Sequence, residues 1–304
     1  MRWPPYEHVF FDCDSTLTTI EGIDVLAESA GKRWRVEVLT QAAMEGQIDL
    51  AEVYERRLKA VRPTRSQIRE IRNAYKRNPV EDAQAVIAAL QELGHEVYII
   101  SGGLLEPVRE FGLFLGVPKE NIRAVGVTYN ELSGQWWIGG DEQYMTYDEG
   151  ALTVSDGKAD IVARLLEGKA GRSLLIGDGS SDLLAGRAVD LFAGFGGVTS
   201  RERVRREAPL FISSTSLAPL LAVAAGPATL RQLRQTSLEQ LADKALKLCQ
   251  QGAISFNDER LKLKFDQAVS AAREAFYSGP GGGSAGDPRR PGALDDWTPD
   301  AGVR

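Results

Sequence analysis

The sequence predicts an α/β fold in which helices cover both faces of a parallel sheet. Apolar, strand-like runs recur along the chain at "HVFFDCD" (8–14), "HEVYIISGG" (95–103), "SLLIGDG" (173–179) and "DLFAGFG" (190–196). Helical patterns that end in glycine separate the last three runs, for example at 104–116 and 158–171. Strands that alternate with helices predict parallel pairing, and uninterrupted apolar strands are typical of a sheet buried on both faces. We therefore expect a Rossmann-like core.

One segment interrupts this alternation with four successive helical patterns and no strand, at 23–31, 32–46, 49–61 and 64–77. We expect these helices to form a cap domain at 21–78. The cap is then an insertion into a discontinuous core, which comprises 1–20 and 79–226. A hairpin with a Ser-Gly turn is expected at 127–140, where polar and apolar residues alternate.

Two further amphipathic helices are expected at 229–252 and 257–276, within a C-terminal helical extension at 227–277. The sequence leaves three roles open for them: they pack on the core, they pair with a second copy in a homodimer, or they dock a partner. The last segment, 278–304, is rich in glycine and proline and predicts disorder.

Composition excludes several classes of function. The formal net charge of −6 argues against a broad electrostatic grip on nucleic acid or on an anionic membrane. No apolar run reaches the ~18 residues that a membrane span needs, and the first residues lack the apolar region of a signal peptide. The two cysteines have no metal-type spacing, which suits a reducing compartment. We therefore expect a cytoplasmic protein.

The predicted strands end in groups that are able to do chemistry. In an open parallel sheet these ends lie at one edge, where ligands bind. One further group, an ammonium, opens the helix before the third run. The candidates are Asp12 and Asp14 after the first run, Ser101 and Gly102 in the second, Asp178, Ser181 and Asp182 after the third, and Lys158 in the helix.

This set of residues suits the hydrolysis of a phosphate monoester. Carboxylate oxygens are hard ligands for Mg²⁺, which shares its coordination shell with substrate phosphate. An aspartate can attack phosphorus, and a second carboxyl group can protonate the leaving alcohol. Each motif alone is weak, because an Asp-x-Asp pair is more often a capped turn and a lone lysine is more often a surface charge. Their joint order makes the chemical interpretation the stronger one.

The motifs "DCDSTL", "SGG", "GK" and "GDGSSD", in this order, resemble the four motifs of the haloacid dehalogenase superfamily, and the helical insert resembles the cap of its phosphoserine phosphatase-like branch. The resemblance covers roughly residues 7–225. It implies that Asp12 is the nucleophile and that Asp14 is the general acid and base, with a backbone carbonyl on Mg²⁺. It further implies a metal ligand at Asp178, with support from Asp182. Ser101 and Lys158 would then hold the phosphate.

The same resemblance extends to the substrate. It implies that Glu21 recognises an ammonium group and that Arg57 grips a carboxylate, which together would select phosphoserine for serine biosynthesis. One departure is Ser181, where the branch usually has asparagine; the shorter serine lacks the two amide donors. The less specific alternative is that Glu21 caps a helix and Arg57 is a solvated charge.

Three functions therefore remain open at the level of sequence. The first is a Mg²⁺-dependent phosphomonoesterase that acts on phosphoserine through an aspartyl-phosphate. The second is a phosphatase of another small organic phosphate. The third is a non-catalytic regulatory or binding protein on the same fold. The intact acids Asp12, Asp14 and Asp178 favour an enzyme.

Overall fold

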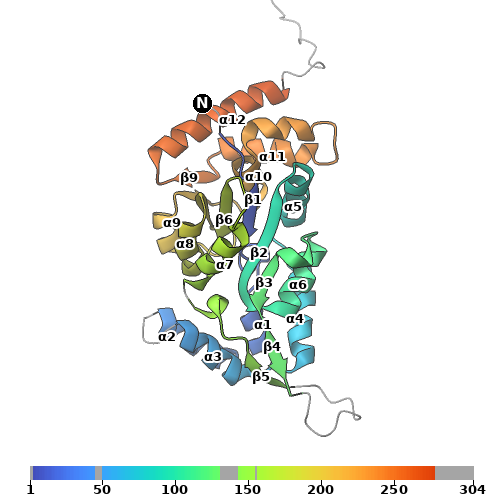
Figure 1. Ribbon diagram of the computed structural model, residues 1–304, viewed down its shortest axis with the longest axis vertical. Coiled ribbons are helices and arrows are strands. Elements are labelled where there is room, and N and C mark those ends of the chain that lie inside the picture. The colour runs from blue at the N-terminus through green and yellow to red at the C-terminus, as the bar shows by residue number, and fades with distance from the viewer. Residues whose placement is uncertain (1–2, 45–49, 131–142, 155, 278–304) are drawn as a thin grey trace, which may run out of the picture.

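The computed structural model describes residues 3–44, 50–130, 143–154 and 156–277, and its main feature is a seven-stranded sheet (Figure 1). The strand order is β3-β2-β1-β6-β7-β8-β9. Every pairing is parallel except that of β8 with β9. The strands are β1 His8–Phe11, β2 Glu96–Leu104, β3 Ile122–Val125, β6 Ser173–Gly177, β7 Leu191–Phe195, β8 Leu210–Ile212 and β9 Ile254–Phe256.

The predicted parallel sheet is confirmed, and each of the four predicted runs contains a strand. The sequence predictions omit β3, β8 and β9. These strands have only four, three and three residues, so they are too short to show a periodic pattern.

Helices cover both faces of the sheet, as predicted. Val9, Phe11 and Ile99 point to one face and pack with α5, α6 and α10, whereas Phe10 and Leu175 point to the other and pack with α7, α8 and α9. This division follows from the alternation of side chains along each strand. The helices are α5 Ala83–Glu92, α6 Leu105–Phe114, α7 Gly157–Leu166, α8 Ser180–Ala185, α9 Glu202–Glu207 and α10 Ala218–Ala225, with short 3-10 turns at η1 Lys119–Asn121, η3 Ala151–Thr153 and η4 Gly186–Ala188.

The inserted segment forms the four predicted helices at one end of the molecule (Figure 1). They are α1 Gly22–Ser29, α2 Arg33–Met44, α3 Leu50–Val61 and α4 Arg65–Arg77. Thr64 caps α4 through a reciprocal pair of hydrogen bonds with Gln67. The division of the chain into the domains given above stays a prediction.

A two-stranded antiparallel ribbon lies beside the cap helices and comprises β4 Val127–Tyr129 and β5 Tyr144–Tyr147. The first strand of the predicted hairpin is therefore present. The predicted turn at Ser133 and Gly134 and the rest of that hairpin lie outside the described residues. Tyr144 N donates to Pro63 O, which ties the ribbon to the start of α4.

The prediction of one continuous helix at 229–252 is wrong. The chain instead forms a 3-10 helix, η5 Pro227–Leu233, and then α11 Glu239–Gln250. The break has a local cause: the Thr236 hydroxyl donates to Leu233 O and accepts from Leu238 N, and Gln235 has a φ of 64°. A threonine side chain that bonds the nearby backbone in this way competes with helical hydrogen bonds.

The C-terminal extension packs on the core at the end opposite the cap (Figure 1). β9 pairs antiparallel with β8 and so covers that edge of the sheet. The last helix, α12 Glu259–Tyr277, confirms the second predicted amphipathic helix. Its Phe265 packs edge-on against Trp3, with the two ring centroids 4.9 Å apart. The homodimer stays a prediction, and 278–304 lies outside the described residues. Within the described chain, no helix combines the length and the apolar character that a membrane span requires.

Candidate active site

Three central strands bring the predicted acids to one edge of the sheet. Phe11, the last residue of β1, is in register with Ile99 on one side and Ile176 on the other. Asp12 N continues the ladder by donating to Ile176 O at 2.9 Å. Asp12 therefore leaves the sheet at the level where β6 ends and Asp178 begins its loop.

Asp12, Asp178 and Asp182 form a compact group of buried carboxylates. One oxygen from each lies within 4.8 Å of the others. Like charges at this separation repel, so the group needs a cation. The hard oxygen donors and their burial fit a divalent ion such as Mg²⁺. The sequence prediction placed Asp182 in a supporting role, whereas here its carboxylate belongs to the same group as the other two.

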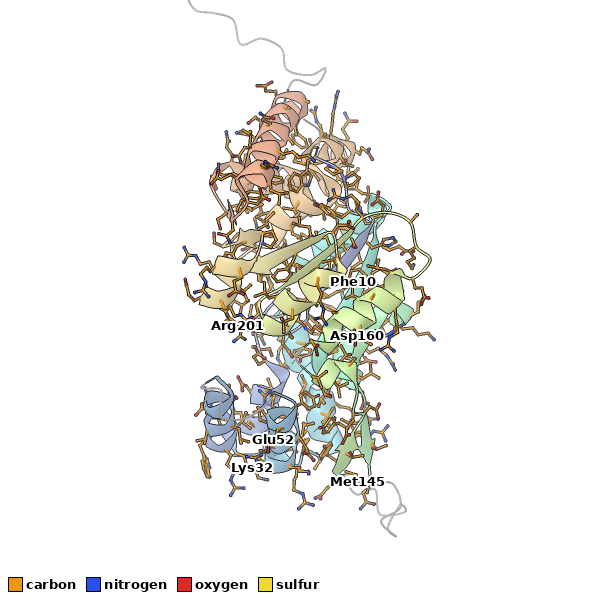
Figure 2. The ribbon with its side chains drawn as sticks, turned by 60° about the vertical axis from the view of Figure 1, so that its left-hand side comes forward. Phe10, Lys32, Glu52, Met145, Asp160 and Arg201 are labelled. Carbon is orange, nitrogen blue, oxygen red and sulfur yellow. The ribbon has the colours of Figure 1, made fainter. Side chains whose placement is uncertain are left out.

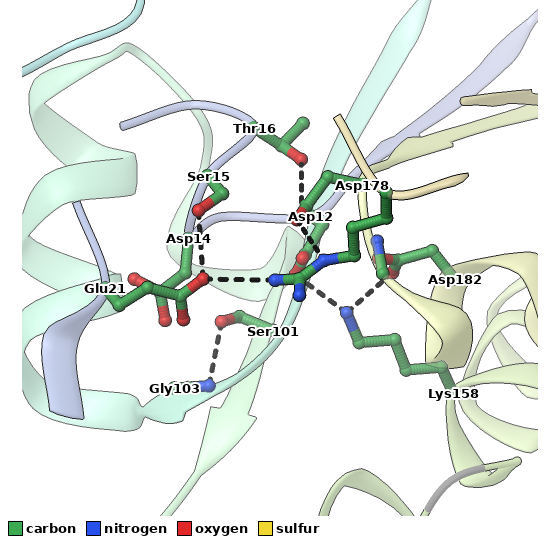
Figure 3. Close-up of polar contacts among 12 residues, drawn as sticks. Asp12, Asp14, Ser15, Thr16, Glu21, Ser101, Gly103, Lys158, Asp178 and Asp182 are labelled. Atoms are coloured by element: carbon green, nitrogen blue, oxygen red, sulfur yellow. Dashed lines mark hydrogen bonds and ion pairs between the residues drawn. The ribbon is translucent and has the colours of Figure 1, made fainter. Parts of the chain in front are cut away.

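Lys158 supplies a fixed positive charge beside this group (Figure 3). It is the second residue of α7, and its Nζ donates to Oδ1 of Asp12 and to Oδ1 of Asp182, each at 2.7 Å. Burial alone would lower the pKa of Lys158, but the two carboxylates outweigh burial and raise it. The two short contacts therefore favour the charged form of Lys158. Asp182 also accepts from Gly179 N at 3.0 Å, which holds its other oxygen.

Asp178 is held by a residue that the sequence predictions omit, Arg201. Arg201 Nε donates to Oδ2 of Asp178 at 2.9 Å, and Thr16 Oγ1 donates to Oδ1 at 3.4 Å. Burial and the nearby Asp12 raise the pKa of Asp178 to about 6, although Arg201 opposes this shift. Figure 2 shows Arg201 on the core, on the side toward Glu52 of α3 and toward Lys32, which lies between α1 and α2.

Asp14 faces the cap rather than the buried acids. Its Oδ1 accepts from the hydroxyl of Tyr75 on α4 at 2.5 Å and from Gly22 N at 3.2 Å. Burial, followed by the charge of Glu21, raises the pKa of Asp14 well above its usual range. A carboxyl group with a raised pKa suits a proton donor.

Ser101 and Gly102 lie near the end of β2, beside Asp14. The pairing of β2 with β3 shifts register between Ile100 and Leu104, so these residues leave the regular ladder. Ser101 is fully buried, and its Oγ accepts from Gly103 N at 2.9 Å. The helix α6 starts at Leu105, so small residues and a hydroxyl precede a helix N-terminus, where anions are stabilised.

Glu21 and Arg57 both belong to the cap side, since Glu21 directly precedes α1 and Arg57 lies on α3. Glu21 Oε1 accepts from Ser15 Oγ at 2.9 Å and lies 3.5 Å from Arg201 Nη2. Although Glu21 stands at the N-cap position of α1, its side chain makes no capping hydrogen bond. Arg57 Nε is buried and has no hydrogen-bond partner among the described residues. Burial lowers the pKa of Arg57, and the charge of Glu21 is the largest effect that opposes this shift. Glu21 therefore does not cap α1 through its side chain, and Arg57 is half-buried, with its Nε out of contact with solvent.

The remaining predicted residue, Ser181, lies half-buried in the first turn of α8, one position before Asp182. The sequence predictions omit Tyr75 and Arg201, which both bind acids of the site. Tyr75 continues the buried stripe that Ile68 and Ile71 form on α4, and a hydroxyl on an apolar stripe is a signal that could have identified it. Arg201 begins a charged run that reads as a solvated surface, so the sequence offers no comparable signal for it.

Comparison with known proteins agrees with this geometry. The family model described as haloacid dehalogenase-like hydrolase matches residues 9–187. Phosphoserine phosphatase of Drosophila melanogaster is 33% identical over 67% of this chain and 74% of its own length. Phosphoserine phosphatase of Mus musculus is 31% identical over 67% of this chain and 88% of its own length.

Solved structures share the fold. A phospho-aspartyl intermediate analogue of phosphoserine phosphatase superposes with a TM-score of 0.59 at 22% identity, and the match covers 71% of this chain and 98% of that one. A substrate-bound phosphoserine phosphatase complex gives a TM-score of 0.59 at 21% identity, and the match covers 71% of this chain and 97% of that one. With its motifs, fold and curated relatives in agreement, the chain is a phosphatase that belongs to the haloacid dehalogenase-like hydrolase family.

Proposed function

We propose that this phosphatase is a Mg²⁺-dependent phosphomonoesterase that hydrolyses phosphoserine through an aspartyl-phosphate on Asp12. The observation that carries the proposal is the position of Asp12. Its carboxylate stands at the end of a buried strand, beside Asp178 and Asp182, with a buried ammonium 2.7 Å away. Lys158 can therefore balance negative charge as phosphate approaches.

Asp12, Asp178 and the backbone carbonyl of Asp14 would hold Mg²⁺, which supplies positive charge between a carboxylate and a phosphate dianion. In the first step an Asp12 oxygen forms a bond to phosphorus, and the bond from phosphorus to the ester oxygen breaks. The departing oxygen takes a proton from Asp14. In the second step Asp14 takes a proton from water as the water oxygen attacks phosphorus, and the Asp12 carboxylate is released with inorganic phosphate.

Glu21 and Arg57 support phosphoserine as the substrate. Arg57 has a buried Nε without a hydrogen-bond partner in the described chain, and an arginine fork suits a carboxylate. Glu21 offers the opposite charge for an ammonium group. Both residues lie on the cap side of the site, across from Lys158, so the amino acid part of the substrate would lie under the cap while its phosphate reaches Asp12. The curated relatives named phosphoserine phosphatase support the same substrate.

A second candidate substrate is another small organic phosphate. It is favoured by Ser181, which stands in the first turn of α8 without the amide group that the phosphoserine phosphatase-like branch usually has there.

A substrate panel distinguishes phosphoserine from another small organic phosphate. The panel contains L-phosphoserine, phosphothreonine, phosphohomoserine and sugar phosphates, and phosphate release is measured with Mg²⁺. The proposal expects the highest kcat/KM for L-phosphoserine. A higher value for a phosphate that lacks the ammonium and carboxylate groups would replace phosphoserine with that substrate.

A further inference from the structure

The hydroxyl of Tyr75 connects the cap to the residue that we propose as the proton donor. Tyr75 is fully buried on α4, and its hydroxyl donates to Oδ1 of Asp14 at 2.5 Å. The Gly22 N–H donates to the same oxygen at 3.2 Å. Both hydrogen bonds therefore fall on one oxygen of Asp14, and they fix the plane in which its carboxyl group lies.

The other oxygen, Oδ2, faces the strand end that we propose to hold phosphate. A methyl group built on Gly103 would lie 3.1 Å from Asp14 Oδ2 and 3.1 Å from Ser101 Oγ. Oδ2 and the Ser101 hydroxyl therefore border the same small space, which exists because Gly103 has no side chain. The two oxygens of Asp14 thus have different surroundings: Oδ1 is enclosed by donors, and Oδ2 is directed at the phosphate loop.

Packing leaves the Tyr75 hydroxyl little freedom. Its ring lies against Phe111 of α6 with a centroid distance of 5.4 Å. On the other side, a methyl group on Gly22 would overlap with the Tyr75 hydroxyl, so the first residue of α1 is small where the hydroxyl passes. A rigid ring with an enclosed hydroxyl can hold a carboxyl group in one orientation, which is how supporting residues usually sharpen a site.

We propose that Tyr75 is a positioning residue that orients Asp14 so that Oδ2 exchanges the proton with the leaving group. This inference rests on the proposed function. When the bond from phosphorus to the ester oxygen breaks, the proton on Oδ2 passes to that oxygen and leaves the alcohol neutral. When water attacks the aspartyl-phosphate, its proton passes back to Oδ2. Oδ1 keeps its two hydrogen bonds throughout, so the carboxyl group does not rotate between the steps.

A role in positioning and a role in stability alone make different predictions for the leaving group. An alkoxide such as that of serine is a poor leaving group and needs the proton. A nitrophenolate is a stable anion and departs without one. Loss of a correctly aimed acid should therefore slow the transfer from phosphoserine selectively, whereas a general loosening of the cap should slow transfer from both substrates.

The experiment compares wild type, Tyr75→Phe and a matched control, Tyr129→Phe. Tyr129 also ties the cap side to the core, because its hydroxyl donates to Glu106 with a donor–acceptor distance of 3.3 Å. This hydrogen bond involves none of the four aspartates of the site. Transfer to the enzyme is measured in single turnover with L-phosphoserine and with p-nitrophenyl phosphate. Tyr75→Phe should slow the reaction with phosphoserine about tenfold or more and leave that with p-nitrophenyl phosphate within about twofold. Tyr129→Phe should change neither.

Equal losses for both substrates in Tyr75→Phe, or no loss for either, would overturn the inference. If Tyr75→Phe does not fold, Gly22→Ala displaces the hydroxyl from its other side and should give the same selective loss. Asp14→Asn separates this inference from the proposed function. If Asp14→Asn shows the selective loss and Tyr75→Phe does not, only the role of Tyr75 fails; if Asp14→Asn shows none, the proposed proton donor is wrong.

Discussion

Lys158 Nζ lies 2.7 Å from Oδ1 of Asp12, so the proposed nucleophile is paired with a buried cation. The same ammonium lies 2.7 Å from Asp182, which makes it the centre of a buried triad of charges. Removing one member of such a group leaves the others uncompensated, and this is more costly than the pairing is favourable. Lys158 therefore has a structural role in addition to its proposed role toward phosphate.

Lys158→Met should lower the free energy of unfolding by about 3–5 kcal/mol, because it leaves the buried carboxylates of Asp12 and Asp182 without their counter-charge. Urea denaturation without divalent ions measures this. Lys169→Met is the matched control: Lys169 pairs with Glu96 at 2.7 Å on the surface, so its loss should cost less than about 1 kcal/mol. Similar small losses in both variants would show that the buried triad contributes little.

Activity should require Mg²⁺, because the proposed ligands of Asp12, Asp14 and Asp178 are all oxygens. Excess chelator should abolish phosphate release, and added Mg²⁺ should restore it. Ca²⁺ should support little turnover, since its larger and looser coordination shell would misplace the nucleophile relative to phosphate. Full activity in chelator would contradict a metal-dependent mechanism.

Glu21→Gln and Arg57→Ala should damage phosphoserine hydrolysis selectively. Each lost charged contact is worth ~1.5–3 kcal/mol, so kcat/KM should fall roughly ten- to a hundredfold. A generic aryl phosphate, which has neither an ammonium nor a carboxylate, should be hydrolysed almost as well as by wild type. Proportional losses with both substrates would instead indicate damage to the fold or to the chemistry, and the proposed clamp would be wrong.

Much of the fold could be predicted from the sequence, because it depends on local patterns. The run that ends at Asp12 is apolar without interruption, and the helices of the cap repeat their apolar residues with a helical period. The convergence of Asp12, Asp178 and Lys158 then follows from the parallel topology.

The contacts that could not be predicted join distant parts of the chain. Tyr75 meets Asp14 across 61 residues and Arg201 meets Asp178 across 23, and neither pair has a spacing that a local pattern could show. β9 joins the sheet only because β8 offers it an edge, which depends on the folded core. The break at Thr236 was missed for a different reason: one hydroxyl outweighed an otherwise regular helical pattern.

The most direct test is a rapid acid quench of the enzyme during turnover of ³²P-labelled L-phosphoserine. We expect a transient, acid-stable and hydroxylamine-sensitive label on wild type, which peptide mapping should locate at Asp12. Asp12→Asn should fold normally, carry no label and lose roughly 10³-fold or more in kcat. Wild-type turnover of phosphoserine without label at Asp12, or ordinary turnover by purified Asp12→Asn, would contradict the account.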